Sequence, residues 1–60
     1  MSPISKRIRE ARIRAWISQE RLAIQAGIDP ASARARMSRY ERGARVPDPE
    51  TLERIARVLT

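Results

Sequence analysis

Three dipeptides in which a capping residue precedes proline divide this chain into helical segments. They are Ser2-Pro3, Asp29-Pro30 and Asp48-Pro49. In each, a side-chain oxygen can accept a hydrogen bond from the first turn of a helix, and the proline ring fixes φ near the helical value. Ser18, followed by Glu20, marks a fourth start. No run typical of a β-strand is present, so the sequence predicts an all-α fold.

The spacing of apolar residues extends each start into a short helix. Gly27 and Gly43 follow two of these helices, and glycine readily supplies the positive φ at which helices often end. The predicted helices span residues 3–14, 18–26, 30–40 and 49–59 of a single domain, 1–60. Their expected apolar faces are Ile4, Ile8, Ala11 and Ala15; Leu22, Ala23 and Ala26; Ala33, Met37 and Tyr40; and Leu52, Ile55, Ala56 and Leu59. Glu50 with Arg54 and Glu53 with Arg57 are expected to pair at i,i+4 spacing.

The composition excludes several functions. Sixty residues form only a small core, and the absence of Cys and His excludes disulfides and Cys/His zinc fingers. The usual nucleophile–base pairs cannot be assembled either, so we expect no enzymatic activity, no metal and no cofactor. No apolar run of about 18 residues exists, and the basic N-terminus is not a secretory signal.

The charge balance favours a polyanionic partner. Thirteen basic residues, twelve of them Arg, outnumber seven acidic ones and give a net charge of +6. Arginine grips phosphates and guanine edges with a planar fork, so nucleic acid is a natural ligand. The alternative is a solvated surface in an organism whose codon usage favours Arg.

The third helix offers the surface for such a partner. Its side opposite the apolar face carries small residues and arginines, namely Ser32, Ala35, Arg36 and Arg39, with Ala31 and Arg34 at the edges. Small residues let a backbone approach DNA closely, while long basic side chains reach bases or phosphates. This side is therefore either a recognition surface or an ordinary solvated face.

Five blocks in this order resemble the phage-repressor, Cro-like helix-turn-helix domains, also called the XRE family. The blocks are Ile8-Arg9-Glu10-Ala11-Arg12, Ser18-Gln19-Glu20-Arg21-Leu22-Ala23, Ala26-Gly27-Ile28, Tyr40-Glu41-Arg42-Gly43-Ala44-Arg45-Val46-Pro47 and Ile55-Ala56-Arg57-Val58-Leu59. The resemblance covers residues 4–59. It implies a compact lambda-repressor-like bundle of four, at most five, short helices whose third helix enters the major groove.

The resemblance also assigns roles to residues. Base contacts are implied for Arg34, Ala35, Arg36, Arg39 and Ser32, and contacts to the DNA backbone for Gln19, Ser18, Arg42 and Arg45. Arg12 and Glu41 match a structural ion pair between the first helix and the loop after the third. Two alternatives remain: Gln19 as a plain polar residue at a helix start, and Arg12 as a phosphate contact.

Three departures from the family pattern stand out. Gly27 and Glu41 are fourteen residues apart where the family has ten, so either the third helix or the loop before it is longer. Trp16 occupies the place of a glycine, so we expect an altered turn, with the indole covering the core or contacting a partner subunit. The sequence ends at Thr60, where many relatives continue into a dimerisation helix.

The sequence therefore predicts a cytoplasmic, nucleoid-associated protein of bacterial or phage type that regulates transcription, as a repressor. Its partner is a double-stranded DNA operator, bound as a homodimer without a small-molecule ligand. One alternative is an antitoxin or architectural module that needs a protein partner. Another, a basic amphipathic peptide on a membrane, is disfavoured by the paired charges and turn motifs.

Overall fold

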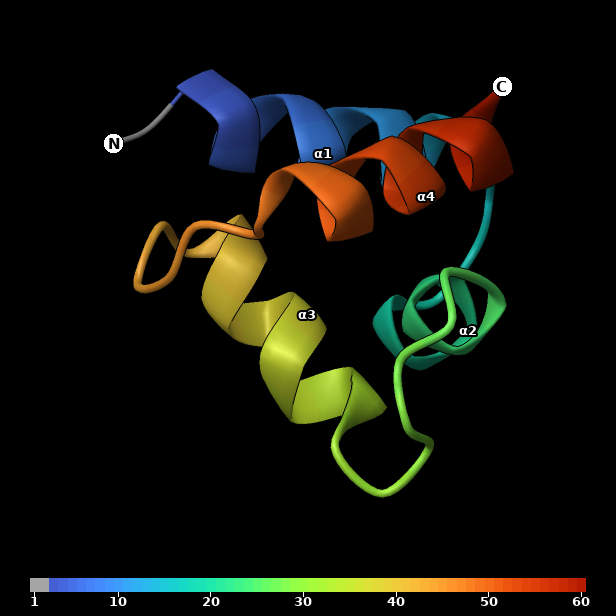
Figure 1. Cartoon of the computed structure of the whole chain (residues 1–60). Coiled ribbons are helices and arrows are strands. Elements are labelled where there is room, and N and C mark those ends of the chain that lie inside the picture. The colour runs from blue at the N-terminus through green and yellow to red at the C-terminus, as the bar shows by residue number, and fades with distance from the viewer. Residues whose placement is uncertain (1–2) are drawn as a thin grey trace.

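The fold consists of four short helices joined by turns (Figure 1). A computed structural model describes residues 3–60, with side chains from residue 4 onward. In this range the helices are α1 (Pro3–Arg14), α2 (Gln19–Gln25), α3 (Ala33–Glu41) and α4 (Pro49–Leu59), and there is no strand. Figure 1 shows α1 and α4 side by side above α2 and α3. The predicted all-α bundle of four helices is confirmed; the predicted cap Ser2 lies outside the described residues.

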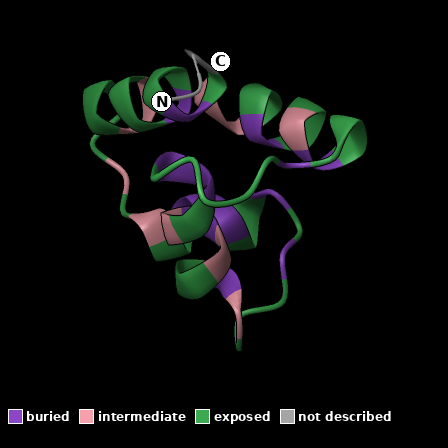
Figure 2. Ribbon diagram, turned by 90° about the vertical axis from the view of Figure 1, so that its left-hand side faces the viewer, coloured by how far each residue is buried: buried purple, intermediate pink, exposed green. Residues whose placement is uncertain are grey.

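The core forms where the helices meet. Leu22 of α2, Met37 of α3 and Ile55 of α4 are its largest fully buried side chains. Figure 2 shows the buried segments turned toward the centre of the molecule and the exposed ones outward. The remaining core residues are Ile8, Ala23, Ala26, Ile28, Ala33 and Tyr40. The predicted inward face of the third helix is thus confirmed.

The apolar faces predicted for α1 and α4 are partly wrong. In α1, Ile8 is buried, but Ile4 is 36% exposed and Ala15 is exposed, whereas Ser5 is buried. The inward face therefore runs through residues 5, 8 and 12, because Arg12 reaches toward α3 from this side. In α4, Ile55 is buried and Leu52 and Leu59 pack against the core, but Ala56 is exposed and Thr51 is buried in its place.

The start predicted for the third helix is also wrong, because α3 begins at Ala33 rather than Pro30. The Asp29 carboxylate accepts a hydrogen bond from the backbone N–H of Ala31 at 2.9 Å, and the Ser32 N–H donates to the Asp29 carbonyl at 3.0 Å. These bonds close a turn in which the Asp side chain mimics the backbone. The extra residues before Glu41 therefore include this turn, and α3 itself has only nine residues.

The ends of α2 agree with the cap residues read from the sequence. The Ser18 hydroxyl accepts a hydrogen bond from the Arg21 N–H at 3.0 Å and so caps the helix. Gly27 follows α2 with φ of 88°, and Gly43 follows α3 with φ of 73°. Both glycines thus occupy the left-handed region, which costs them little. They set the directions in which the chain leaves α2 and α3.

Trp16 overturns two expectations. It adopts φ of 57°, the left-handed conformation natural to the glycine it replaces, so the turn geometry is kept rather than altered. Its side chain is 95% exposed and does not cover the core. Hydrogen bonds from the Trp16 N–H to Ile13 and from the Ile17 N–H to Arg12 hold the turn between α1 and α2. These hydrogen bonds therefore hold Trp16 in a strained, left-handed backbone conformation.

Candidate nucleic-acid interface

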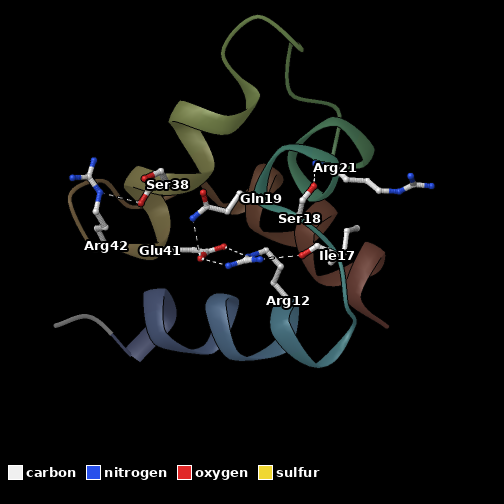
Figure 3. A network of polar contacts seen from close by, with 8 residues as sticks. All are labelled: Arg12, Ile17, Ser18, Gln19, Arg21, Ser38, Glu41 and Arg42. Carbon is white, nitrogen blue, oxygen red and sulfur yellow. Dashed lines mark hydrogen bonds and ion pairs between the residues drawn. The ribbon is translucent and has the colours of Figure 1, made fainter.

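A polar network ties α1, α2 and α3 together beneath the candidate surface (Figure 3). Arg12 grips the Glu41 carboxylate with two donors, Nε to Oε2 at 2.6 Å and Nη2 to Oε1 at 3.1 Å. The third nitrogen of the guanidinium donates to the Ile17 carbonyl at 3.0 Å, and Gln19 donates its amide to Glu41 Oε1 at 3.2 Å. The side chains of Arg12 and Glu41 are only 16% and 3% exposed. The bidentate pair holds α1 against the end of α3, and the bonds to Gln19 and Ile17 attach the start of α2 to both.

The outward face of α3 presents small and basic side chains. At 100° per residue, the direction opposite Ala33 and Met37 passes through Ala35, Ser38 and Arg42, with Arg39 beside them. Ala35, Arg39 and Arg42 are exposed and Ser38 is half-buried. Between residues 33 and 45 there are five arginines and one acidic residue, Glu41. Because Arg12 neutralises Glu41 inside the fold, the surface of this segment is strongly positive.

One flank of α3 adjoins the start of α2. Arg34 lines a shallow depression together with Ser18 and Gln19. This flank therefore brings together three residues predicted to contact DNA and one member of the predicted ion pair, namely Ser18, Gln19, Arg34 and Arg12. The Ser18 hydroxyl already serves as the helix cap, and the Gln19 amide already donates to Glu41. Gln19 thus braces the network beneath α3 while remaining half-buried at its surface.

The other flank of α3 adjoins the loop that follows it. Arg36, Arg39 and Arg45 line a concavity there, together with Tyr40. Arg36 donates from Nη2 to the Tyr40 hydroxyl at 2.7 Å, and its guanidinium carbon lies 5.8 Å from the centre of the Tyr40 ring. Arg36 is therefore held at the edge of the outward face, away from Arg34 and Gln19.

Ser32 lies before α3 rather than on it. It is half-buried, and its hydroxyl donates to the Asp29 carbonyl at 3.4 Å within the turn that precedes the helix. Ser32 therefore lies at the N-terminal end of α3, where its carbonyl accepts a hydrogen bond from the Arg36 N–H at 2.9 Å, and its base contact stays a prediction.

Sequence reasoning missed two surface residues. Ser38 and Arg9 line a depression between α1 and α3, together with Arg12, Gln19, Glu41 and Arg42. Ser38 lies three residues after Ala35 and four before Arg42, so helical spacing alone would have placed it on the outward face. Arg42 also donates from Nε to the Ser38 carbonyl at 3.4 Å, at the end of α3 (Figure 3). Nothing in the sequence marks Arg9, because only the packing of α1 brings it here.

Other kinds of site find little support in the described part of the chain. Residues 3–60 contain no group of three or more His, Cys, Asp or Glu side chains placed to hold a metal ion. None of the described helices is both long and apolar enough to cross a membrane.

A short α2, a glycine turn and an α3 with a basic outward face define a helix-turn-helix DNA-binding domain. The profile of a family described as a helix-turn-helix domain matches residues 4–60, and the chain belongs to this family. The chain is also similar to the solved crystal structure of the transcriptional regulator BswR, with 45% sequence identity and a TM-score of 0.87. That alignment covers 93% of this chain and 55% of the other, so this chain spans about half the length of that regulator. No curated protein matches the chain.

Proposed function

We propose that this domain binds double-stranded DNA in a sequence-specific way and regulates transcription, acting as a repressor. The observation that carries the proposal is the outward face of α3, where Ala35 lies between basic side chains and Arg12 removes the nearest negative charge. A small residue at the centre lets the helix enter the major groove, where arginines can reach base edges. The similarity to a transcriptional regulator supports the regulatory role.

Each predicted site residue except Arg36 has a role in this proposal. Arg34, Ala35 and Arg39 contact base edges, with Ser38 between them, and Ser32 contacts a base edge from the N-terminal end of α3. Gln19 and Ser18 contact a phosphate at the start of α2, and Arg42 and Arg45 contact the backbone beyond the end of α3. A homodimer of such domains reads an inverted repeat whose half-sites lie about one helical turn apart, roughly 10 bp. The protein works in the cytoplasm, bound to the nucleoid.

Selection of bound sites from a random duplex pool at about 0.15 M salt tests the proposal, because non-specific binding is weak under these conditions. We expect a recovered palindrome with half-sites roughly 10 bp apart. A single unrepeated motif would retain sequence-specific binding but exclude the homodimer. No enrichment at all would contradict sequence-specific recognition.

A second candidate is a DNA-binding module that needs a protein partner, such as an antitoxin. Trp16 favours it, since this large side chain is 95% exposed in a strained turn and tryptophan is enriched at protein–protein interfaces. Light scattering on the purified chain separates the two candidates. A homodimer that binds DNA unaided would contradict an obligatory partner, whereas co-purification with a stoichiometric protein from the native cell would favour one.

A further inference from the structure

The concavity on the loop side of α3 contains positive charge without a partner of opposite sign. It has a volume of about 200 Å³ and is lined by Arg36, Arg39, Tyr40 and Arg45. Among the described residues, no carboxylate lines it. Three guanidinium groups around one hollow repel one another unless an anion lies between them. The hollow is also several times larger than the roughly 30 Å³ share of one water molecule in the liquid, so it has room for a polyatomic anion.

Tyr40 gives this hollow a rigid wall. The residue is only 3% exposed, so its ring is anchored in the core. Its hydroxyl oxygen accepts the hydrogen bond from Arg36 at 2.7 Å, and the ring lies beside the same guanidinium. Arg36 is therefore oriented before any ligand arrives, which reduces the entropy lost on binding. Arg45 approaches from the loop that follows α3 and is exposed.

The donors in this hollow match a tetrahedral oxyanion. Each guanidinium carries several N–H donors in a planar fork and no acceptor. The Tyr40 oxygen uses a lone pair to accept from Arg36, so its own O–H remains able to donate to an anion. Arginine forks bind phosphate oxygens with paired, charge-assisted hydrogen bonds. A phosphate group has enough acceptor oxygens to use all of these donors.

We propose that Arg36, Tyr40 and Arg45 form a phosphate-binding site, with Arg39 at its outer edge. Arg36 then grips the sugar-phosphate backbone and does not read a base, and Tyr40 is the positioning residue that holds it. The assignment to a DNA phosphate rests on the proposed function. The same chemistry would also hold a free phosphate-bearing molecule, so the test has one arm for each source.

The first arm uses inorganic phosphate alone, titrated into the ¹⁵N-labelled full chain against chloride at matched ionic strength. We expect the Nε–Hε signals of Arg36 and Arg45 to shift and saturate with phosphate only. The reference is Arg54, which pairs with Glu50 on α4. Absence of a shift at Arg36 and Arg45, or an equal shift at Arg54, would overturn the site.

Two variants test whether the phosphate-dependent shifts arise from this site. Arg45→Gln changes an exposed loop residue and should weaken phosphate binding severalfold without affecting the fold. Tyr40→Phe keeps the buried ring and removes only the hydroxyl that holds Arg36. The Arg36 side chain should become more mobile, and the shift of its Nε–Hε signal on adding phosphate should become smaller. Circular dichroism checks that both variants remain helical. A Tyr40→Phe variant with unchanged phosphate binding would remove Tyr40 from the site.

The second arm measures duplex binding as a function of salt for the wild type and the Arg36→Gln, Arg45→Gln double variant. Loss of one phosphate contact should make the negative slope of log K against log salt shallower by about 0.9. Affinity should fall roughly tenfold, and by the same factor for a selected duplex and for a random one. A loss confined to the selected duplex would mean that Arg36 reads a base, which would overturn the proposal.

The two arms distinguish the possible failures. If phosphate binds in the first arm but the double variant binds DNA normally, the site holds a free phosphate-bearing molecule and the DNA assignment is wrong. If the wild type binds no DNA at all, the proposed function fails, while the first arm still decides whether the phosphate site exists.

Discussion

The two flanks of α3 use arginine in opposite ways. On the flank toward α2, the Arg12 guanidinium makes its hydrogen bonds within the protein, to the Glu41 carboxylate and to the Ile17 carbonyl. On the flank toward the loop after α3, Arg36 and Arg45 line a concavity with Tyr40, and no carboxylate is among the lining residues. We call these the network flank and the open flank. One arginine stabilises the fold, whereas the others remain available to a ligand.

The difference lies in the burial of the partners. Glu41 is nearly inaccessible to water, so its charge must be compensated within the protein. No carboxylate lines the concavity on the open flank, and Arg36 lies beside the Tyr40 ring instead. Changes to Arg12 or Glu41 should therefore alter stability, while changes to Arg36 or Arg45 should alter binding.

The largest expected effect comes from Glu41→Gln, which leaves the Arg12 charge mostly buried and unpaired. We expect a loss of about 3 kcal/mol in the free energy of unfolding, measured by denaturant titration. A domain of 60 residues is stable by only about 3–9 kcal/mol in total. At the lower end of this range, the variant should be partly unfolded at room temperature. A loss below about 0.5 kcal/mol, the value for an exposed pair, would contradict the difference between the flanks.

A smaller effect, of opposite sign, is expected for Trp16→Gly in the turn that presents the Ile17 carbonyl to Arg12. Removing the left-handed strain should raise the free energy of unfolding by about 1–2 kcal/mol. The greater flexibility of glycine in the unfolded chain should lower it by about 0.5–1 kcal/mol. Because the indole is 95% exposed, little packing is lost. Net stabilisation of about 1 kcal/mol should raise Tm by roughly 4–8 °C. A lower Tm would mean that the indole contributes to stability despite its exposure.

Asp48 lies on neither flank, and as the cap of α4 it makes the stability of the whole domain depend on acid pH. The hydrogen bond from the Thr51 hydroxyl, followed by that from the Thr51 backbone N–H, lowers the pKa of Asp48 below its ordinary value of 3.8. Because its pKa is lower in the folded state, ionised Asp48 stabilises the fold above its unfolded-state pKa. That contribution is lost as the pH falls through its folded-state pKa. Asp48→Asn, which still caps a helix, should make Tm less dependent on pH below about pH 4. An unchanged acid slope would contradict this role.

The smallest effect is expected for Glu53→Gln on α4. This residue pairs with Arg57 at 2.6 Å, the same length as the Arg12–Glu41 pair, but both side chains are more than half exposed. We expect a loss of only about 0.3–0.5 kcal/mol, and less at high salt. A loss comparable to that of Glu41→Gln would show that burial is not what separates the pairs.

Helix number and caps could be predicted from the sequence because they depend on neighbouring residues. Ser18, Gly27 and Gly43 act where the local pattern placed them. Asp29 misled because an Asp side chain accepts a backbone N–H both in a helix cap and in a tight turn. The two-residue sequence is the same in both cases, so the start of α3 could not be derived from it.

The remaining differences depend on tertiary packing. The rotation of the α1 face toward Ser5 follows from the reach of Arg12 to Glu41, and the φ of Trp16 follows from the bonds that hold the turn. Within the candidate site, the arginines named from the sequence lie on or beside α3, and their contacts with DNA stay a prediction. The sequence could not separate Arg36 from Arg39, because only the structure shows the Tyr40 hydroxyl that holds Arg36.

The most direct test of DNA reading by α3 compares the sites selected by Arg39→Ala with those selected by Arg57→Ala. Arg39 lies on the outward face of α3, whereas Arg57 is an exposed arginine of α4 paired with Glu53. We expect Arg57→Ala to recover the wild-type site and Arg39→Ala to lose preference at a defined base position, at a cost of about 1–3 kcal/mol. If both variants recovered the same site with equal preference, α3 would not read the sequence through this face.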